Sequence, residues 1–139
     1  MRASIFVAGM RRRIIPWDVM RDEVHPSVKV IEEWEFSECS QLTIVNLGEG
    51  LEEIGEGAFQ LCTSLHETFV PDAVKAIKEL AFSGCSGLTI VILGEGLEEM
   101  GEAAFGWCDS LARIVIPPAV KAIQAGTFNR CSQLSTVKI

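Results

Sequence analysis

The sequence predicts a repeat solenoid, with a parallel β-sheet along one side and short extended, 3₁₀ or helical turns on the other. Three observations predict this fold: the cysteines are evenly spaced, apolar residues recur at fixed distances from them, and each intervening stretch is too short to fold alone. The five cysteines lie 23 residues apart, at Cys39, Cys62, Cys85, Cys108 and Cys131. Repeats of this length are typical of solenoids, in which each unit completes its core by stacking on its neighbours.

The other apolar positions follow the cysteine in every unit. A leucine stands three residues after it and a phenylalanine three residues before it, as Leu65 and Phe59 do around Cys62. Further apolar residues stand eight and eleven residues before it. Units therefore start near residues 16, 39, 62, 85, 108 and 131, the first degenerate and the last incomplete. We predict a solenoid domain at 16–139, preceded by a basic N-terminal extension at 1–15.

A second period, of 46 residues, overlies the first. Units 39–61 and 85–107 are identical at 17 of 23 positions. Units 62–84 and 108–130 share the run Pro-x-Ala-Val-Lys-Ala-Ile. The simplest explanation is duplication of a two-unit block, and near-copies of a unit are expected to fold alike.

Within a unit, apolar residues alternate after the leucine, which predicts a short strand. Residues 88–93 and 111–116 are examples. Glycine or proline then ends the strand and turns the chain. We expect a second extended segment or a 3₁₀ turn around 74–77, and a short helical turn at the Ala-Phe pair before the next cysteine. Strands stacked about 4.8 Å apart would form one parallel sheet.

The cysteine column has three possible interpretations. A metal site does not suit it, because one ligand per unit forms a line rather than a tetrahedron. Disulfides are awkward, because the side chains would point the same way and their number is odd. Free cysteine is among the most buried residue types, so we expect the column to be reduced and in the core. No histidine column accompanies it as a catalytic base, and we predict no enzyme activity, no metal and no cofactor.

Two columns of charge lie beside the core positions. One alternates in sign from unit to unit, through Lys29, Glu52, Lys75, Glu98 and Lys121. Opposite charges on adjacent strands stabilise pairing by roughly 0.2–1 kcal/mol, so the column favours the native stacking order over a one-unit slip; an ion-binding ladder is the alternative. The other column comprises Glu33, Glu56, Glu79 and Glu102. It precedes the expected helical turns, and we interpret it as local capping on a solvated face.

The charge of the chain is unevenly distributed. The net charge is −7, yet residues 1–17 contain four arginines and no acidic residue. An acidic body argues against a duplex nucleic-acid binder, which needs a basic face. No apolar run is long enough to span a membrane. The basic leader is either an organelle-targeting segment or a disordered or capping extension.

The repeat resembles a known family. The pattern C-x-x-L-x-x-[IV]-x-[IL]-P-x-x-V-x-x-I-x-x-x-A-F, over about residues 16–139, is similar to the BspA-type leucine-rich repeat. The resemblance implies a curved solenoid that acts as a binding or adhesion module rather than an enzyme. Members are often repeat regions of larger surface or secreted proteins, whereas this chain shows no clear signal peptide, so a location inside the cell is the default expectation. Alternate units also carry glycine where the family usually has proline.

The outward side of the predicted sheet is the best candidate for function. If the leucine and the two apolar residues after it point inward, the residues between them face solvent. The predicted partner-binding residues are Ile44, Asn46, Glu67, Phe69, Ile90, Ile92, Arg113 and Val115. The centre of this set is apolar, and exposed apolar patches with polar rims mark interaction sites. The alternative is that β-branched residues are present because they suit strands.

We therefore predict a non-catalytic module that binds a protein or other macromolecular partner through this face. A purely structural role, as a spacer or a segment of a longer repeat or adhesion protein, is the alternative. The sequence stops at Ile139, at the end of a predicted strand, with no capping unit. An uncapped unit exposes apolar core and unpaired backbone, so we expect either a continuation of the array or self-association through this end.

Overall fold

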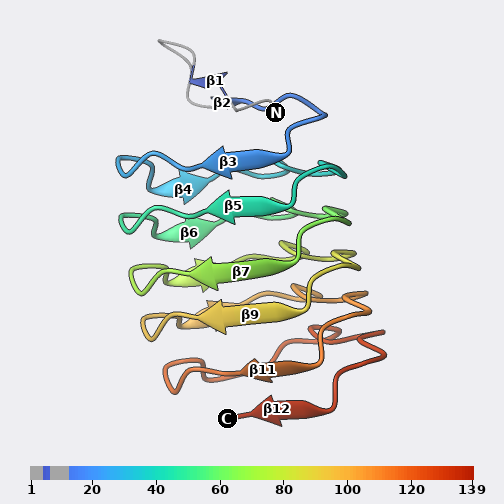
Figure 1. Ribbon diagram of the computed structural model, residues 1–139. Coiled ribbons are helices and arrows are strands. Elements are labelled where there is room, and N and C mark those ends of the chain that lie inside the picture. Colours follow the sequence, from blue (N-terminus) through green and yellow to red (C-terminus); the bar gives the residue numbers. More distant parts are fainter. Residues whose placement is uncertain (1–4, 7–12) are drawn as a thin grey trace.

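The chain forms a stack of similar turns in which the strands of successive units lie side by side (Figure 1). The computed structural model describes residues 5–6 and 13–139. At the N-terminal end, β1 (Ile5–Phe6) pairs with β2 (Arg13–Ile14) in an antiparallel ladder. Of the basic extension predicted at 1–15, Arg2, Arg11 and Arg12 lie outside the described residues.

Two sets of parallel strands run along the stack. The front strands are β3 (Arg21–Glu23), β5 (Ile44–Asn46), β7 (Glu67–Val70), β9 (Ile90–Leu93), β11 (Arg113–Val115) and β12 (Thr136–Lys138). The back strands are β4 (Val30–Ile31), β6 (Glu53–Ile54), β8 (Ala76–Ile77) and β10 (Glu99–Met100). The parallel strands expected on one side of the stack are therefore confirmed, and the second extended segment expected around 74–77 is β8, which pairs within its own sheet.

Every parallel pairing has the 23-residue register. β7 pairs with β9 from Glu67↔Ile90 to Val70↔Leu93, and β6 pairs with β8 through Glu53↔Ala76. Partners are always equivalent residues of neighbouring units. The solenoid predicted from the cysteine spacing is therefore confirmed, with the cysteines marking the same point of each turn.

The core consists of columns that run along the stack. Neighbouring phenylalanine rings are nearly parallel, with centroids 4.9 Å apart between Phe36 and Phe59 and 6.3 Å apart between Phe105 and Phe128. The leucine and cysteine columns lie beside the rings. Because each ring is covered by the ring of the next unit, burial of apolar surface depends on stacking, as expected for a solenoid.

The cysteines are free thiols within this core. Four are buried and Cys131 is half-buried, which confirms the interpretation of the column as reduced core residues. The thiol of Cys62 donates a hydrogen bond to the carbonyl oxygen of Phe36, 3.1 Å away. The same contact recurs in the next three units, at Cys85, Cys108 and Cys131. Each thiol therefore links its turn of the stack to the turn before it.

The turns before the cysteines are not helical, contrary to the expectation for the Ala-Phe segment. No helix is present in the described part of the chain. Two residues of each unit have positive φ, such as Gly57 at 59° and Leu61 at 60°, and left-handed residues end a helical turn. The N–H of Gly57 instead donates to the carbonyl of Glu79, 2.9 Å away in the next unit. Bonds between units thus replace bonds within a helix.

The front strands are joined in pairs by a double hydrogen bond. The N–H and the hydroxyl of Thr89 both donate to the carbonyl oxygen of His66, at 2.8 and 3.0 Å. Thr43 makes the same two bonds to Met20. At Ser135 the N–H and hydroxyl again donate to one carbonyl, at 3.0 and 3.4 Å. These hydroxyl residues recur every 46 residues, so the longer period of the sequence has a structural counterpart.

The junctions between these pairs are looser. β3 and β5 form one front sheet, and β7, β9, β11 and β12 form another. Within the second sheet, β9 and β11 share only the register pair Arg113↔Ile90, whereas β7 and β9 share four. Backbone pairing between the front strands is therefore weakest at two junctions, between β5 and β7 and between β9 and β11.

Glycine is present at two positions where neighbouring units approach closely, and one of them, Gly94, replaces the proline of alternate units. A Cβ atom on Gly94 would lie 2.6 Å from the carbonyl oxygen of Pro71, and one on Gly96 would overlap the carbonyl oxygen of Asp72. A larger residue at either position would push the units apart. Small residues at Gly94 and Gly96 are therefore a packing requirement at this corner.

Candidate partner-binding surface

The front strands expose alternate residues, as the sequence predicted. β7 and β9 both alternate between exposed and buried side chains. All eight predicted residues are exposed, and they form two rows along the stack. The first row is Ile44, Glu67, Ile90 and Arg113, and the second is Asn46, Phe69, Ile92 and Val115.

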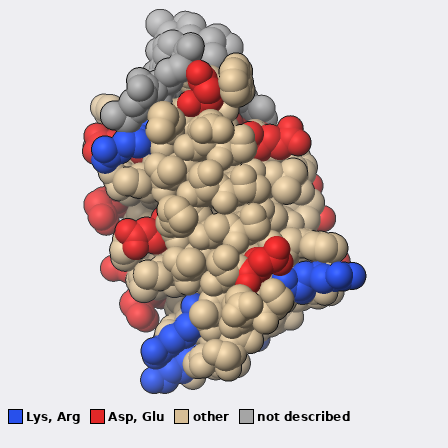
Figure 2. All heavy atoms as spheres, turned by 45° about the vertical axis from the view of Figure 1, so that its right-hand side comes forward, with Lys and Arg blue, Asp and Glu red and all other residues tan. Residues whose placement is uncertain are grey.

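Large apolar side chains occupy the centre of this front face. Phe69 is 58% exposed and Ile92, its register partner, is 51% exposed. Ile44, Ile90 and Val115 are 41–47% exposed. Figure 2 shows a broad area of the stack without charged side chains, with most charged residues along its margins. The centre of the front face therefore exposes apolar side-chain surface to solvent.

A hollow of about 340 Å³ opens between β9 and β11. Its lining comes from residues 89–92 and 112–115. The hollow lies at the loosely paired junction of β9 and β11, where the two strands share one register pair only. Ile92 and Val115 line it from the two strands, so its walls are largely apolar.

The charges of the front face are segregated along the stack. Glu67 on β7 lies on the N-terminal side of the apolar centre, and so does Glu23, which accepts a 3.4 Å hydrogen bond from the side chain of Asn46. Arg113 on β11 and Lys138 on β12 lie on the C-terminal side. Except for Arg21 on β3, acidic groups therefore precede the centre and basic groups follow it.

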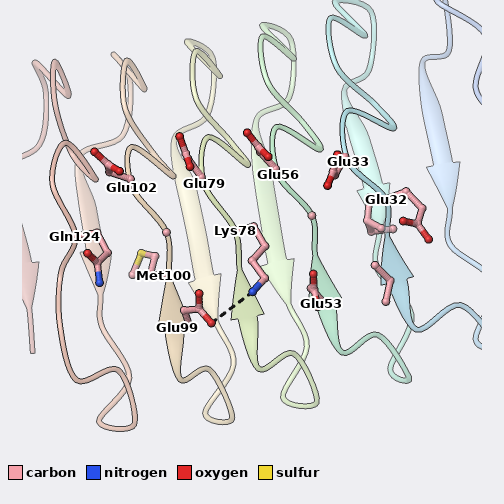
Figure 3. Close-up of a pocket in the computed structure, with 14 residues that line it drawn as sticks. Glu32, Glu33, Glu53, Glu56, Lys78, Glu79, Glu99, Met100, Glu102 and Gln124 are labelled. Carbon is pink, nitrogen blue, oxygen red and sulfur yellow. Dashed lines mark ion pairs between the residues drawn. The ribbon is translucent and has the colours of Figure 1, made fainter.

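The back strands carry a second surface feature, which the sequence did not predict. A groove of about 450 Å³ runs across them (Figure 3). Its acidic lining residues are Glu32, Glu33, Glu53, Glu56, Glu79, Glu99 and Glu102. Lys78 lies among them and forms a 3.6 Å ion pair with Glu99. In the described residues, no group of three or more potential ligands is arranged to hold a metal ion.

The role expected for the column of Glu33, Glu56, Glu79 and Glu102 is wrong. These residues were expected to cap helical turns, but the described turns contain no helix. The carbonyl groups of Glu56, Glu79 and Glu102 instead accept bonds from neighbouring units, as when Glu56 accepts from the N–H of Trp34 at 2.9 Å. The side chains line the edge of the acidic groove in a single row (Figure 3).

The alternating column is exposed and lies on adjacent units. The N–H of Glu52 donates to the carbonyl of Lys29, and the N–H of Glu98 donates to the carbonyl of Lys75, at 2.7 and 2.9 Å. Opposite charges therefore follow each other along one edge, where alternation favours the native order of units over a slip by one. That role remains a prediction.

Burial suppresses ionisation of the thiols. Desolvation, with a smaller contribution from the Asp22 carboxylate, raises the pKa of Cys39 to about 11. Desolvation also raises the pKa of Cys62, Cys85 and Cys108. Because the thiolate is the reactive form of cysteine, these side chains are unreactive at neutral pH.

Sequence reasoning missed the hollow and the acidic groove for different reasons. The hollow depends on the separation of β9 from β11, and its only sequence signal is the 46-residue recurrence of Thr43, Thr89 and Ser135. The groove collects glutamates from several positions of the unit. Those positions lie side by side only because the back strands stack in register.

Comparison with solved structures shows the same architecture in bacterial proteins. A leucine rich repeat protein of T. pallidum superposes with a TM-score of 0.82 at 28% identity, over 85% of this chain and 57% of that one. A leucine rich cell surface protein of Faecalibacterium prausnitzii gives 0.80 at 30%, over 87% and 36%. A leucine-rich repeat protein of Bacteroides ovatus gives 0.84 at 27%, over 98% and 39%. This chain therefore spans 36–57% of the length of these proteins.

No curated protein matches the chain. The described residues include no helix of the length and apolar character that crossing a membrane requires. The model of a family described as BspA type leucine rich repeat region (6 copies) matches residues 22–139. The chain belongs to the BspA-type leucine-rich repeat family.

Proposed function

We propose that this chain is a non-catalytic interaction module that binds a protein partner through its front face. One observation carries the proposal: a contiguous set of large apolar side chains is 41–58% exposed on that face. Exposed apolar patches with polar rims mark interaction sites. The family and the fold are typically non-enzymatic, and a binding role is typical of them.

The expected energetic contribution can be bounded from the side chains. Complete burial of a Phe or Ile side chain stabilises a complex by about 1.5–3 kcal/mol. Phe69 and Ile92 are about half exposed, so each has roughly half of that contribution still available to a partner. Introduction of a charge adds a desolvation cost, and we expect an aspartate at either position to weaken binding by at least about tenfold.

The test compares partner capture by four immobilised proteins. Phe69→Asp and Ile92→Asp should lose partners that the wild type retains, since both residues are in the apolar centre. Leu61→Asp is the matched control, because Leu61 is 42% exposed in a turn outside the front strands. Its backbone is left-handed, and aspartate tolerates that conformation. Equal capture by all four proteins, each folded by circular dichroism, would contradict the proposal.

A structural role in a larger surface protein is the second candidate. It is supported by the similarity to a leucine rich cell surface protein, of which this chain spans 36%. In that case the front face is a solvated wall and the array acts as a spacer. Unchanged capture by the two front-face variants is the result that favours this candidate over the first.

A further inference from the structure

We infer that the front face binds a second copy of this chain, in a face-to-face dimer whose two-fold axis runs along β9. The inference rests on the proposed function, because it uses the same face and names the partner. Its basis is that the front face is complementary to itself in charge and in shape. Self-complementarity is the property that a two-fold interface requires.

The axis determines which strands meet. Rotation about a line along β9 keeps the strand direction and reverses the order of the strands. β7 of each copy then lies opposite β11 of the other, and β5 lies opposite β12. Equivalent rows stay opposite each other, since all front strands share the 23-residue register.

Charges of opposite sign meet in this arrangement. Glu67 of each copy faces Arg113 of the other, so the contact forms twice. In the second row, Asn46 faces Lys138. At the axis, Ile90 and Ile92 lie against their own counterparts. On the five strands from β5 to β12, each of Glu67, Arg113 and Lys138 therefore meets an opposite charge or a polar side chain.

The shape of the face is also complementary. Phe69, the most exposed side chain of the set at 58%, lies opposite Val115 and the hollow between β9 and β11. An apolar cavity of about 150 Å³ holds a benzene-sized ring, and the hollow measures about 340 Å³. The ring of each copy can therefore enter the hollow of the other, where Ile92 and Val115 line the walls.

Other arrangements of two copies lack this match. A two-fold axis along the stack places β7 over β7, which leaves Glu67 opposite Phe69 and Arg113 opposite Val115. A shift of the axis to lie between β7 and β9 places Glu67 opposite Ile90 and Arg113 opposite Ile44. Each alternative buries a charged group against an apolar one, which is costly. Charge complementarity thus selects the axis along β9.

The interface is small. Five strands about 4.8 Å apart and three residues long cover roughly 24 by 10 Å, well below a standard protein interface. We therefore expect a weak dimer, with a dissociation constant in roughly the micromolar range or above. Sedimentation velocity at concentrations from about 5 μM to 1 mM covers that range.

The decisive experiment is a charge exchange. Glu67→Arg places like charges opposite each other in the homodimer, and so does Arg113→Glu, so each variant alone should dimerise at least about tenfold more weakly. In a mixed dimer of the two variants, one contact pairs the native Glu67 with the native Arg113, and the other pairs the introduced arginine with the introduced glutamate. An equimolar mixture should therefore sediment as a dimer again. Glu38→Arg and Arg130→Glu are matched controls in turns outside the front strands, and both should dimerise like the wild type.

The outcomes separate the inference from the proposed function. A wild type that remains monomeric at every concentration overturns the inference. Dimerisation that neither charge reversal weakens also overturns it, because the dimer would then form through another surface, such as the C-terminal end. If that monomer still captures a protein that Phe69→Asp loses, the proposed function stands without the inference. A dimer restored only in the mixture of variants supports the inference.

Discussion

The buried thiols predict that the fold becomes unstable in mild alkali. An ordinary cysteine has a pKa of 9.0, whereas burial raises the pKa of Cys39 to about 11 and also raises that of Cys62, Cys85 and Cys108. Above pH 9 the unfolded chain releases these protons and the folded chain retains them. The stability that the neutral thiols contribute is therefore complete below pH 9 and is lost as the pH rises toward the folded pKa values.

The magnitude follows from the number of thiols. Each one lowers the free energy of unfolding by about 1 kcal/mol for each pH unit above 9. Between pH 9 and pH 10 the four thiols together remove about 4 kcal/mol, a large part of the 5–15 kcal/mol typical of a domain. The chain has no tyrosine, and lysine titrates mainly above pH 10, so few other groups contribute in this window.

The perturbation is Cys85→Ala, studied by urea unfolding at pH 7.5, 9 and 10 under reducing conditions. At pH 7.5 the variant should be less stable than the wild type by about 1–3 kcal/mol, because a small cavity replaces the sulfur and the bond to Phe59 is lost. At pH 10 the difference should shrink by about 1 kcal/mol, because one titrating thiol is gone. Cys85→Ser, which also removes the thiol, should show the same shallower pH dependence.

The half-buried thiol provides the control. Cys131 has a raised pKa but is only half-buried, so Cys131→Ala should change the pH dependence less than Cys85→Ala does. A wild type whose stability is equal at pH 7.5 and 10 would refute the reasoning. So would a Cys85→Ala variant whose stability falls as steeply as that of the wild type.

Three further predictions follow from single positions. Thr68→Val should stabilise the fold by about 1 kcal/mol in thermal or urea unfolding, because the hydroxyl of Thr68 is buried without a hydrogen-bond partner; a loss of stability would contradict this. Gly96→Ala should lower the free energy of unfolding by about 2 kcal/mol, because the added methyl group overlaps the preceding unit. Gly106→Ala, whose added methyl group would have its nearest neighbours at 3.4 Å, should lower it little. Equal losses in the two variants would show that the close approach is unimportant. A thiol reagent at pH 8 should label Cys131 well before Cys85, and equal rates would show that the core opens as a whole.

The fold was predictable from the sequence because stacking makes equivalent residues neighbours. Val70 and Leu93 pair because they hold the same position in consecutive units. The same regularity predicted which front residues face solvent, such as Phe69 and Ile92, since side chains alternate along a strand.

The backbone conformation of the turns was not predictable in the same way. Leu61 and Trp107 adopt positive φ although neither residue type favours that conformation. Hydrogen bonds to the next unit hold them there, as when the N–H of Leu61 donates to the carbonyl of Ser83 at 2.8 Å. Local preferences would favour a helical turn, and contacts between units override them.

The sequence by itself determined the repeat, its register, the buried columns and the exposed rows, because each of these depends only on position within the 23-residue unit. The tertiary structure decided where adjacent units bond tightly and where they separate. That difference creates the hollow between β9 and β11, which Ile92, Arg113 and Val115 help to line. It arises from hydrogen bonds and close contacts between units, which no single unit contains.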